Sequence, residues 1–261
     1  MSLNRQKNFK PDSAIAHVVG VEEYWPSASQ VEMHSHKRDQ LMYSTKGAMH
    51  VITENGCWIL PPMRAIWISG GTAHAFKAKR PVDLIILYID PEASGSPKWK
   101  GCAVVNVSSL VRELILTCAS LSWDYLPNSR AGRLTCVLLE QLDALPQAPL
   151  DLPEPKDSRA VRLGQWLKDH PADRTSLTML APKFGASIKT LERLFSSETG
   201  MSFGGWRLRL RMITALEQLA HGESVSNVAF AVGYESPSSF IAAFRSVFGT
   251  TPSRYFDIQH Q

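Results

Sequence analysis

The stretch Gly233–Tyr255, GYESPSSFIAAFRSVFGTTPSRY, decides how the second half of the chain folds. Ser236 is a good N-cap residue, and Pro237 suits the first helical turn, where a missing N–H group costs nothing. Apolar residues then recur at helical spacing, at Phe240, Ala243, Phe244 and Val247. Gly249 predicts the end of this helix, and Pro252 prevents its continuation. The stretch therefore predicts the second half of a helix-turn-helix.

Residues 180–200 carry a second copy of this pattern, the most informative internal repeat in the chain. The copies align at an offset of 48 residues before the turn and 49 after it. The matched residues are Leu180, Ala181, Phe184, Gly185, Ser187, Thr190, Leu191, Phe195 and Gly200 in the first copy, and Val228, Ala229, Val232, Gly233, Ser236, Ser239, Phe240, Phe244 and Gly249 in the second. Residues 203–219 between them predict one long amphipathic helix. Two helix-turn-helix copies joined by a helix indicate a DNA-binding domain.

The C-terminal stretch resembles, almost position for position, the signature of the AraC/XylS family of transcription regulators. The matching residues are Gly233, Tyr234, Ser236, Ser238, Phe240, Phe244, Gly249, Pro252 and Tyr255. The resemblance implies an AraC-type DNA-binding domain over residues 157–261, with helix-turn-helix units at about 176–197 and 224–247. In this family the two recognition helices enter successive major-groove segments, about 34 Å apart on B-DNA. The runs HSHKRDQLMYSTKGAM and RAIWISGGTAHAF look most like the NimR-type subgroup, some of whose members are thought to control a neighbouring efflux gene.

By this resemblance the outer faces of the two recognition helices supply the base contacts. They are Lys189, Glu192 and Arg193 in the first unit, and Ser238, Ser239 and Ala242 in the second. Arg193 can pair with guanine and Glu192 can accept from cytosine, whereas hydroxyl and methyl groups discriminate less. The first unit is therefore predicted to be the sharper base reader. Contacts to phosphate are predicted for Thr190, Arg207 and Arg245.

The first part of the chain, from about Ile15 to Asp90, predicts β-structure. Short apolar runs rich in β-branched and aromatic residues are separated by turn signals. Examples are Gln40–Thr45, Met49–Thr53, Trp58–Leu60, Ala65–Ile68 and Val82–Ile89. Many short strands with regular turns indicate a sandwich or barrel, which we assign to residues 1–107.

Histidines supply the first chemical constellation in this region. His34 and His36 are separated by one residue, so on a strand both side chains point to the same face, which Gln40 would share. His74 lies downstream, after a Gly-Gly turn. Three converging imidazoles suit a divalent transition metal. An alternative is that these four groups hydrogen-bond one another or line a small-molecule pocket.

This arrangement also resembles the cupin pattern of His-x-His, Glu and Gly with a later His. The matching positions are His34, His36, Gln40, Gly47 and His74. Glutamine stands where metal cupins usually have glutamate, and losing that carboxylate weakens the case for a catalytic metal. Regulatory cupins often bind an effector in the barrel, so a small-molecule effector is the preferred interpretation. A divalent metal at His34, His36 and His74 is the other.

Two further segments connect the predicted domains. Residues 108–145 contain two amphipathic patterns, which predict helices that either pack on the barrel or form a dimer interface, as the resemblance suggests. Residues 146–156 lie in LPQAPLDLPEPK, which contains four prolines. Helices cannot run through this stretch, so an extended linker and a domain boundary are predicted there.

Composition bounds the remaining possibilities. The 261 residues are 44% hydrophobic and 20% charged, enough for two modest domains. The net charge of +4 permits nucleic-acid binding without arguing for it. The cysteines show no C-x-x-C or zinc-ribbon spacing, which favours reduced core thiols; they are Cys57, Cys102, Cys118 and Cys136. No signal-peptide core or membrane-length apolar run is present, so we expect a cytoplasmic protein without a membrane partner.

Together these patterns predict an α+β two-domain protein, with a cupin-like β-barrel plus helices followed by an all-α domain with two helix-turn-helix units. The predicted function is a one-component transcription regulator without catalytic residues, controlling a nearby efflux or metabolic gene. Its expected partners are double-stranded DNA, a small-molecule effector, a second copy of the chain and, for an activator, RNA polymerase. The alternative is a metal-dependent cupin enzyme fused to a DNA-binding domain.

Overall fold

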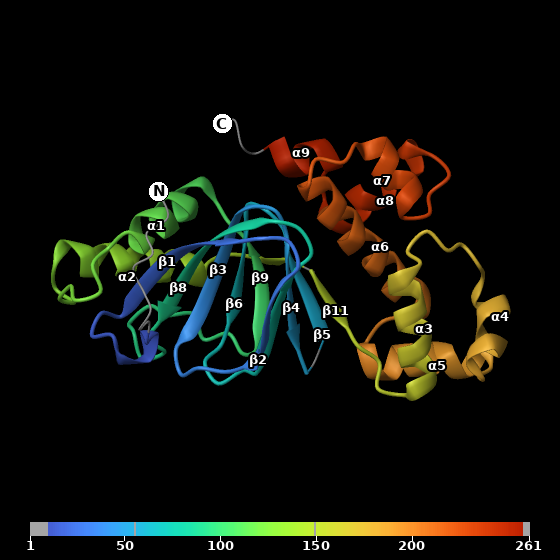
Figure 1. Ribbon diagram of the computed structural model, residues 1–261, viewed down its shortest axis with the longest axis horizontal. Coiled ribbons are helices and arrows are strands. Elements are labelled where there is room, and N and C mark those ends of the chain that lie inside the picture. Colours follow the sequence, from blue (N-terminus) through green and yellow to red (C-terminus); the bar gives the residue numbers. More distant parts are fainter. Residues whose placement is uncertain (1–9, 55, 149, 258–261) are drawn as a thin grey trace. The chain divides into compact units, whose positions relative to one another are not determined.

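The computed structural model describes residues 10–54, 56–148 and 150–257. The ends of the predicted domain ranges 1–107 and 157–261 therefore lie outside the described residues. The chain forms two compact units (Figure 1). The first comprises residues 1–53 and 62–149, and the second comprises residues 54–61 and 150–261.

Antiparallel strands dominate the first part of the chain. One sheet has the order β1 (Val18–Trp25), β8 (Val82–Ile89), β3 (Asp39–Lys46), β6 (Arg64–Ile68), β9 (Cys102–Asn106) and β10 (Gln147–Ala148). The other has the order β11 (Asp151–Pro153), β5 (Gly56–Leu60), β4 (Met49–Thr53), β7 (His74–Ala78) and β2 (Ser29–His34). The predicted β-fold is confirmed. Among the described strands the two sheets stay separate, so the cupin-like barrel is not closed.

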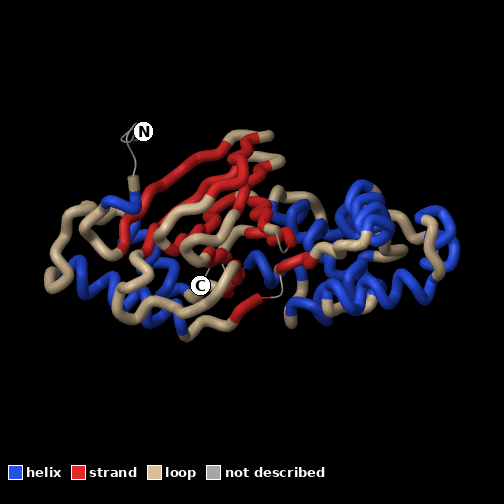
Figure 2. The backbone as a smooth tube through the Cα atoms, turned by 90° about the horizontal axis from the view of Figure 1, so that it is seen from below, coloured by secondary structure: helices blue, strands red, loops and turns tan. Residues whose placement is uncertain are grey.

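Helices α1 (Ser109–Ala119) and α2 (Arg130–Asp143) cover one face of the first sheet (Figure 2). Ser108 and Ser129 cap them by accepting from the backbone N–H group of the third residue of each helix. The period-two alternation of β8 sends its apolar side chains from alternate positions into this core, which also holds α1 and α2 residues. The core members from these elements are Ile85, Leu87, Ile89, Val111, Leu114, Ile115, Leu138 and Leu142. The two helices thus pack on the sheet; the dimer interface stays a prediction.

The second unit is helical after β11. Its elements are α3 (Ser158–Asp169), α4 (Leu177–Leu180), the 3-10 helix η2 (Ala181–Phe184), α5 (Ile188–Thr199), α6 (Phe203–Ala220), α7 (Val225–Ala231), α8 (Pro237–Phe248) and α9 (Pro252–Asp257). The internal repeat is confirmed as two helix-turn-helix units, α4–η2–α5 and α7–α8 (Figure 1). Ser187 and Ser236 cap the second helix of each unit, and Gly200 and Gly249 end these helices in the left-handed conformation.

The proline-rich segment is extended, as its sequence predicts, but it is not a free spacer. Asp151 accepts from Arg209 on α6 at 2.9 Å, and the Trp206 indole donates to the carbonyl of Pro153 at 2.7 Å. Glu198 on α5 accepts from the backbone N–H groups of residues 156 and 157, at 2.6 and 3.0 Å. Residues 151–157 are therefore part of the second unit.

Among the residues that the structure describes, no helix has the length and apolar character needed to cross a membrane.

Candidate nucleic-acid interface and histidine cluster

Helix α5 is amphipathic: one face is buried, and the opposite face carries the predicted base readers. Leu191, Leu194 and Phe195 are buried against the unit, whereas Lys189 and Arg193 are exposed. The cap geometry fixes the start of this helix because Ser187 accepts from the backbone N–H of residue 190. Lys189 and Arg193 lie one helical turn apart, so both side chains can reach the same groove.

Thr190 and Glu192 have contacts within the protein. The Thr190 hydroxyl lies 2.8 Å from the Ser187 hydroxyl, in the cap of α5. One carboxylate oxygen of Glu192 accepts from the backbone N–H of Phe203 at 3.3 Å, at the first residue of α6. A carboxylate at a helix N-terminus is stabilised by the helix dipole. Although Glu192 is exposed, this contact gives it a role within the fold that competes with the predicted base contact.

Helix α8 presents a chemically sparse outer face. Ser238, Ser239, Ala242 and Arg245 are all exposed, opposite the buried Phe240 and Phe244. The Ser239 hydroxyl donates to the Ser236 carbonyl at 2.9 Å, so its proton is engaged in the helix cap. The remaining face forms an open hollow of about 670 Å³, lined by Ser238, Ile241, Ala242, Arg245, Ser246 and Thr251. This lining is mostly apolar or hydroxyl-bearing, as the sequence predicts.

Arg207 does not fit its predicted contact with phosphate. Its side chain is only 13% exposed. The guanidinium donates to the Thr175 carbonyl at 2.7 Å and to both the carbonyl and the carboxylate of Asp173. These bonds hold α6 to the loop before α4, and they compete with the predicted contact with phosphate. Arg245, in contrast, is exposed on the outer face of α8.

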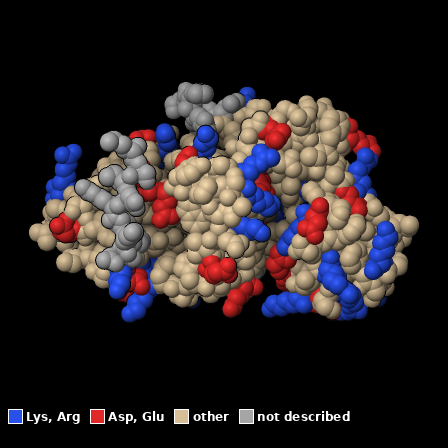
Figure 3. Space-filling model, viewed as in Figure 1, with Lys and Arg blue, Asp and Glu red and all other residues tan. Residues whose placement is uncertain are grey.

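Figure 3 shows Lys and Arg side chains over the part of the surface that α3, α4 and α5 form, interspersed with Asp and Glu. Lys183, Lys189 and Arg193 are exposed members of this region. Exposed cations of this kind attract the phosphate backbone of DNA.

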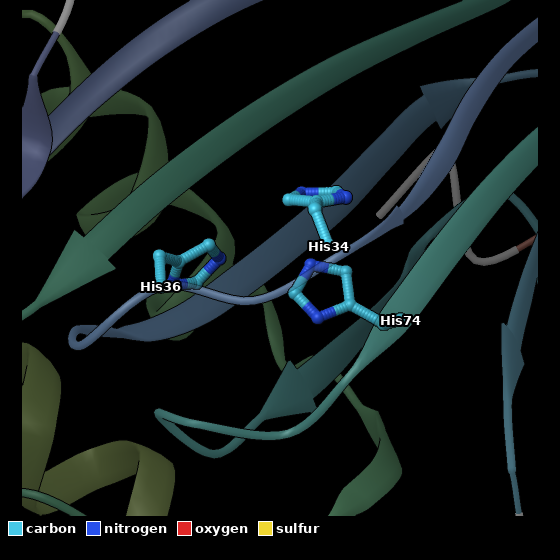
Figure 4. A group of neighbouring side chains, drawn as sticks. All are labelled: His34, His36 and His74. Carbon is cyan, nitrogen blue, oxygen red and sulfur yellow. The ribbon is translucent and has the colours of Figure 1, made fainter.

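The first compact unit of the chain brings together His34, His36 and His74, as the sequence predicts (Figure 4). His34 ends β2 and His74 begins β7, and the two are direct partners in the ladder between these strands. His36 reaches them from the loop between β2 and β3. Ring centroids lie 4.4 Å apart for His34 and His74 and 5.1 Å apart for His36 and His74. One ligand nitrogen from each ring lies within 4.8 Å of the others.

Backbone carbonyls fix the protonation pattern of the three rings. The Nδ1 atoms of His34, His36 and His74 lie 2.9, 2.7 and 2.8 Å from the carbonyl oxygens of residues 32, 38 and 72. A carbonyl only accepts, so each Nδ1 carries a proton, and a neutral ring then has its lone pair on Nε2. The Nε2 of His36 faces the Gln40 side chain. The same second contact orients histidine in many metal sites.

His74 is the buried member of the cluster. Its side chain is 0% exposed, and its Nε2 atom has no hydrogen-bond partner among the described residues. Burial lowers the pKa of His74 to about 4, so the ring is neutral at pH 7. An unpartnered buried lone pair costs free energy unless something binds it.

Gln40 and Tyr88 extend the cluster along the first sheet. Gln40 on β3 is the direct partner of Tyr88 on β8, and its side-chain oxygen lies 3.2 Å from His36 Nε2. The Tyr88 ring centroid lies 5.3 Å from that of His36, and burial raises the pKa of the Tyr88 hydroxyl. Gln40 was predicted from its sequence position. Tyr88 was missed, although its alternate position on the predicted strand Val82–Ile89 would have placed it inside the sandwich.

The loop that precedes His74 is hydrogen-bonded to the segment that carries His36. The backbone N–H of Gly70 donates to the buried carboxylate of Asp39 at 2.7 Å, and that of Gly71 donates to the His36 carbonyl at 2.8 Å. A Cβ atom at Gly70 would lie 2.1 Å from the carbonyl oxygen of Lys37. This close approach requires glycine, and it couples the segment before His74 to the segment that carries His36.

Chemically, the cluster offers three imidazole nitrogens and one amide oxygen. This donor set fits a divalent transition metal, for which imidazole is the commonest neutral protein ligand. The four groups include no carboxylate, so the protein adds no negative charge to a bound cation there.

Comparison with known proteins identifies the class. Residues 180–258 match the family described as a helix-turn-helix domain. The chain is 35% identical over 223 residues to the HTH-type transcriptional regulator NimR of Escherichia coli K12, covering 85% of this chain and 81% of the relative. The protein therefore belongs to the AraC/XylS family of DNA-binding transcription regulators. The similarity to NimR also confirms the predicted subgroup.

Other relatives match over shorter or more divergent stretches. The chain is 44% identical over 113 residues to the transcriptional regulator RipA of Corynebacterium glutamicum, covering 43% of this chain and 33% of the relative. Among solved structures, ToxT from Vibrio cholerae O395 aligns with a TM-score of 0.40 and 10% identity, covering 94% of this chain and 98% of ToxT.

Proposed function

We propose that this transcription regulator responds to a divalent transition-metal ion bound by His34, His36 and His74, with Gln40 as a fourth ligand. The observation that carries the proposal is the buried Nε2 of His74, which no residue in the described part of the chain bonds. Ligand nitrogens of two further rings lie within 4.8 Å of it and of each other. Each ring is already oriented by a carbonyl bond at Nδ1, so metal binding requires little reordering.

The packing around the cluster favours an ion over an organic effector. Side chains that face the inside of the two sheets are closely packed, and Met42, Ile66, Phe76 and Ile86 are all less than 5% exposed. A bulky ligand would have to displace them, at a cost of several kilocalories per mole for each large side chain. A small cation needs only the space between the three imidazoles. A small organic effector, the interpretation that the sequence analysis prefers, is kept as the alternative ligand.

The proposed output is a change in DNA affinity. A ligand shifts a conformational equilibrium only through its different affinity for the two states. Here the bound ion would hold the His36 loop against the strand that begins at His74, favouring the closed arrangement of these two loops. We further propose that the regulator acts as a homodimer on two half-sites, with RNA polymerase as a partner if it activates.

On DNA, Lys189 and Arg193 of α5 are the proposed base readers, and Arg245 of α8 the proposed phosphate contact. Support comes from their exposure on the outer faces of the recognition helices. Ser238 and Ala242 supply shape and methyl contacts in the second groove segment.

The enzyme alternative has less support. A catalytic metal site keeps an open coordination position and needs a group to move protons. The four converging groups include no carboxylate, and the relatives named above are transcription regulators.

Metal titration of the full chain tests the proposal. Calorimetry with Zn²⁺, Ni²⁺, Co²⁺ and Mn²⁺ should detect binding of one ion per chain for at least one metal. His36→Ala should abolish that binding, whereas His170→Ala, at an exposed histidine on the second unit, should retain it. No stoichiometric binding of any of the four ions, or equal binding by both variants, would contradict the proposal.

A further inference from the structure

Two arginines on α6 meet the first helix-turn-helix unit at one carbonyl group. Arg207 and Arg211 both donate to the carbonyl of Asp173, the latter at 2.6 Å. Arg207 also donates to the Thr175 carbonyl, at 2.7 Å. These acceptors lie in the loop between α3 and α4, immediately before the first helix-turn-helix unit. Helix α6 follows the first helix-turn-helix unit directly along the chain. Arg207 and Arg211 also bond it to the loop that precedes that unit.

The second helix-turn-helix unit rests on the same place. Gly233, in the turn between α7 and α8, has a φ of +84°. A Cβ atom there would lie 2.9 Å from the Ala172 carbonyl oxygen and 2.9 Å from Nη2 of Arg211. The Arg211 guanidinium also lies 5.8 Å from the ring centroid of Tyr234, within range of a cation–π contact. Arg211 therefore contacts the loop before the first helix-turn-helix unit and the turn of the second helix-turn-helix unit at the same time.

We infer that Arg211, supported by Arg207, is the positioning residue that fixes the separation of the two recognition helices. We use the name inter-unit clamp for the set of groups that make these contacts, which are Ala172, Asp173, Thr175, Arg207, Arg211 and the turn 233–234. Without it, α5 and α8 would be held together through α6 and the exposed Arg174–Glu235 pair, and each end could swing. With the clamp, the two helix-turn-helix units are joined in two ways, through α6 and through the contacts between the loop before α4 and the turn 233–234.

The physical chemistry of the clamp suits a rigid joint. Burial lowers the pKa of both Arg207 and Arg211, and each is also affected by a neighbouring positive charge. Guanidinium groups nevertheless stay protonated at neutral pH, so their bonds to the Asp173 carbonyl are charge-assisted and strong. Replacing Arg211 removes one of the two donors to the Asp173 carbonyl and also removes the contact with the turn 233–234.

A fixed separation matters because the two recognition helices must enter groove segments about 34 Å apart together. A rigid pair has no ordering cost to meet on binding, and the second contact then becomes an intramolecular event. The inference therefore concerns spacing selectivity and not base preference. It is independent of the metal proposal, because every contact in the clamp lies within the second compact unit, residues 54–61 and 150–261.

Selection from a random-sequence duplex library with the full chain tests this role. The wild type should recover two short sequence elements at one fixed spacing. Arg211→Met should recover the same elements with several spacings, and its affinity for the wild-type consensus should fall by about tenfold or more. Its affinity for a duplex with the first element alone should stay within about twofold of wild type.

The matched control is Arg174→Met. Arg174 pairs with Glu235 between the same loop and turn, but their side chains are 54% and 74% exposed. An exposed pair contributes little, so this variant should keep the single spacing.

Two further variants keep the test decisive if Arg211→Met fails to fold. Arg211→Lys keeps the charge and one donor nitrogen, and should restore most of the spacing selectivity. Gly233→Ala keeps both arginines but inserts a methyl group into the clamp, and should broaden the spacing. Retention of one fixed spacing by every folded variant at Arg211 and Gly233 would overturn the inference.

Discussion

His34 and His74 face each other across the ladder of β2 and β7, with ring centroids 4.4 Å apart. His34 is exposed, whereas His74 is fully buried. One ring is therefore accessible to an ion arriving from solvent, and the other supplies a neutral lone pair that no described residue binds. This contrast within one strand pair underlies the proposed metal response and the first prediction.

The stability of the metal-free protein should fall as the pH drops from about 6.5 to about 4. Burial lowers the pKa of His74 to about 4, so in this range the unfolded chain binds a proton that the folded chain rejects. The loss should reach up to about 3 kcal/mol. His74→Phe should remove this part of the pH dependence, as measured by urea unfolding at pH 7, 6 and 5. An unchanged slope in the variant would assign the effect to other groups.

Gly70→Ala should weaken both folding and metal binding. The new methyl group would lie 2.1 Å from the Lys37 carbonyl and would push the two loops apart. We expect a loss of about 1–3 kcal/mol in the free energy of unfolding. Gly204→Ala is the control, because Gly204 lies in helix α6 and a methyl group there would have no atom within 4 Å. Equal metal affinities in the two variants would show that the loop contact does not support the histidines.

Arg193 and Glu192 are neighbours on α5 with different expected roles. Arg193→Ala should weaken binding to the preferred DNA site by about 1–3 kcal/mol and relax the preference at one base pair. Glu192→Gln should leave base preference unchanged and lower stability by about 0.3–1 kcal/mol, because it weakens the charge at the start of α6. Binding to single-base variants of the site, with thermal unfolding alongside, distinguishes them. A changed base preference in Glu192→Gln would restore its predicted role as a reader.

The salt dependence of DNA binding should separate Arg245 from Arg207. Replacing Arg245 with Ala should reduce the slope of log affinity against log salt by about 1, with no change in base preference. Arg207→Met should leave the slope of log affinity against log salt unchanged, because the Arg207 guanidinium is bonded to Asp173 and Thr175 within the protein. A reduced slope for Arg207→Met would reinstate the contact with phosphate.

The sequence predicted the features that depend on neighbouring residues. The caps at Ser187 and Ser236 and the helix ends at Gly200 and Gly249 follow from local turn and capping rules, and the structure has all four. The strand β2 lies within the predicted β region, but no apolar run identifies it individually, because nearly all its residues are exposed and it lacks the alternation of a half-buried strand.

What the sequence did not predict depends on residues that are distant along the chain. The Arg207 contacts are made with residues more than 30 positions away, and no periodicity reveals such a pairing. The cap that Glu192 provides for α6 depends on how α5 and α6 cross. The histidine cluster itself was predicted from its His-x-His spacing, but the carbonyl bonds at Nδ1 that favour metal binding are visible only in the structure.

The most direct test of the central claim is the affinity of the full chain for DNA from its own upstream region, measured with and without the metal that calorimetry identifies. We expect the metal to change this affinity for the wild type and for His170→Ala, and to leave it unchanged for His36→Ala. Equal affinity of the wild type with and without a bound ion would contradict the account, because the histidine cluster would then not control DNA binding.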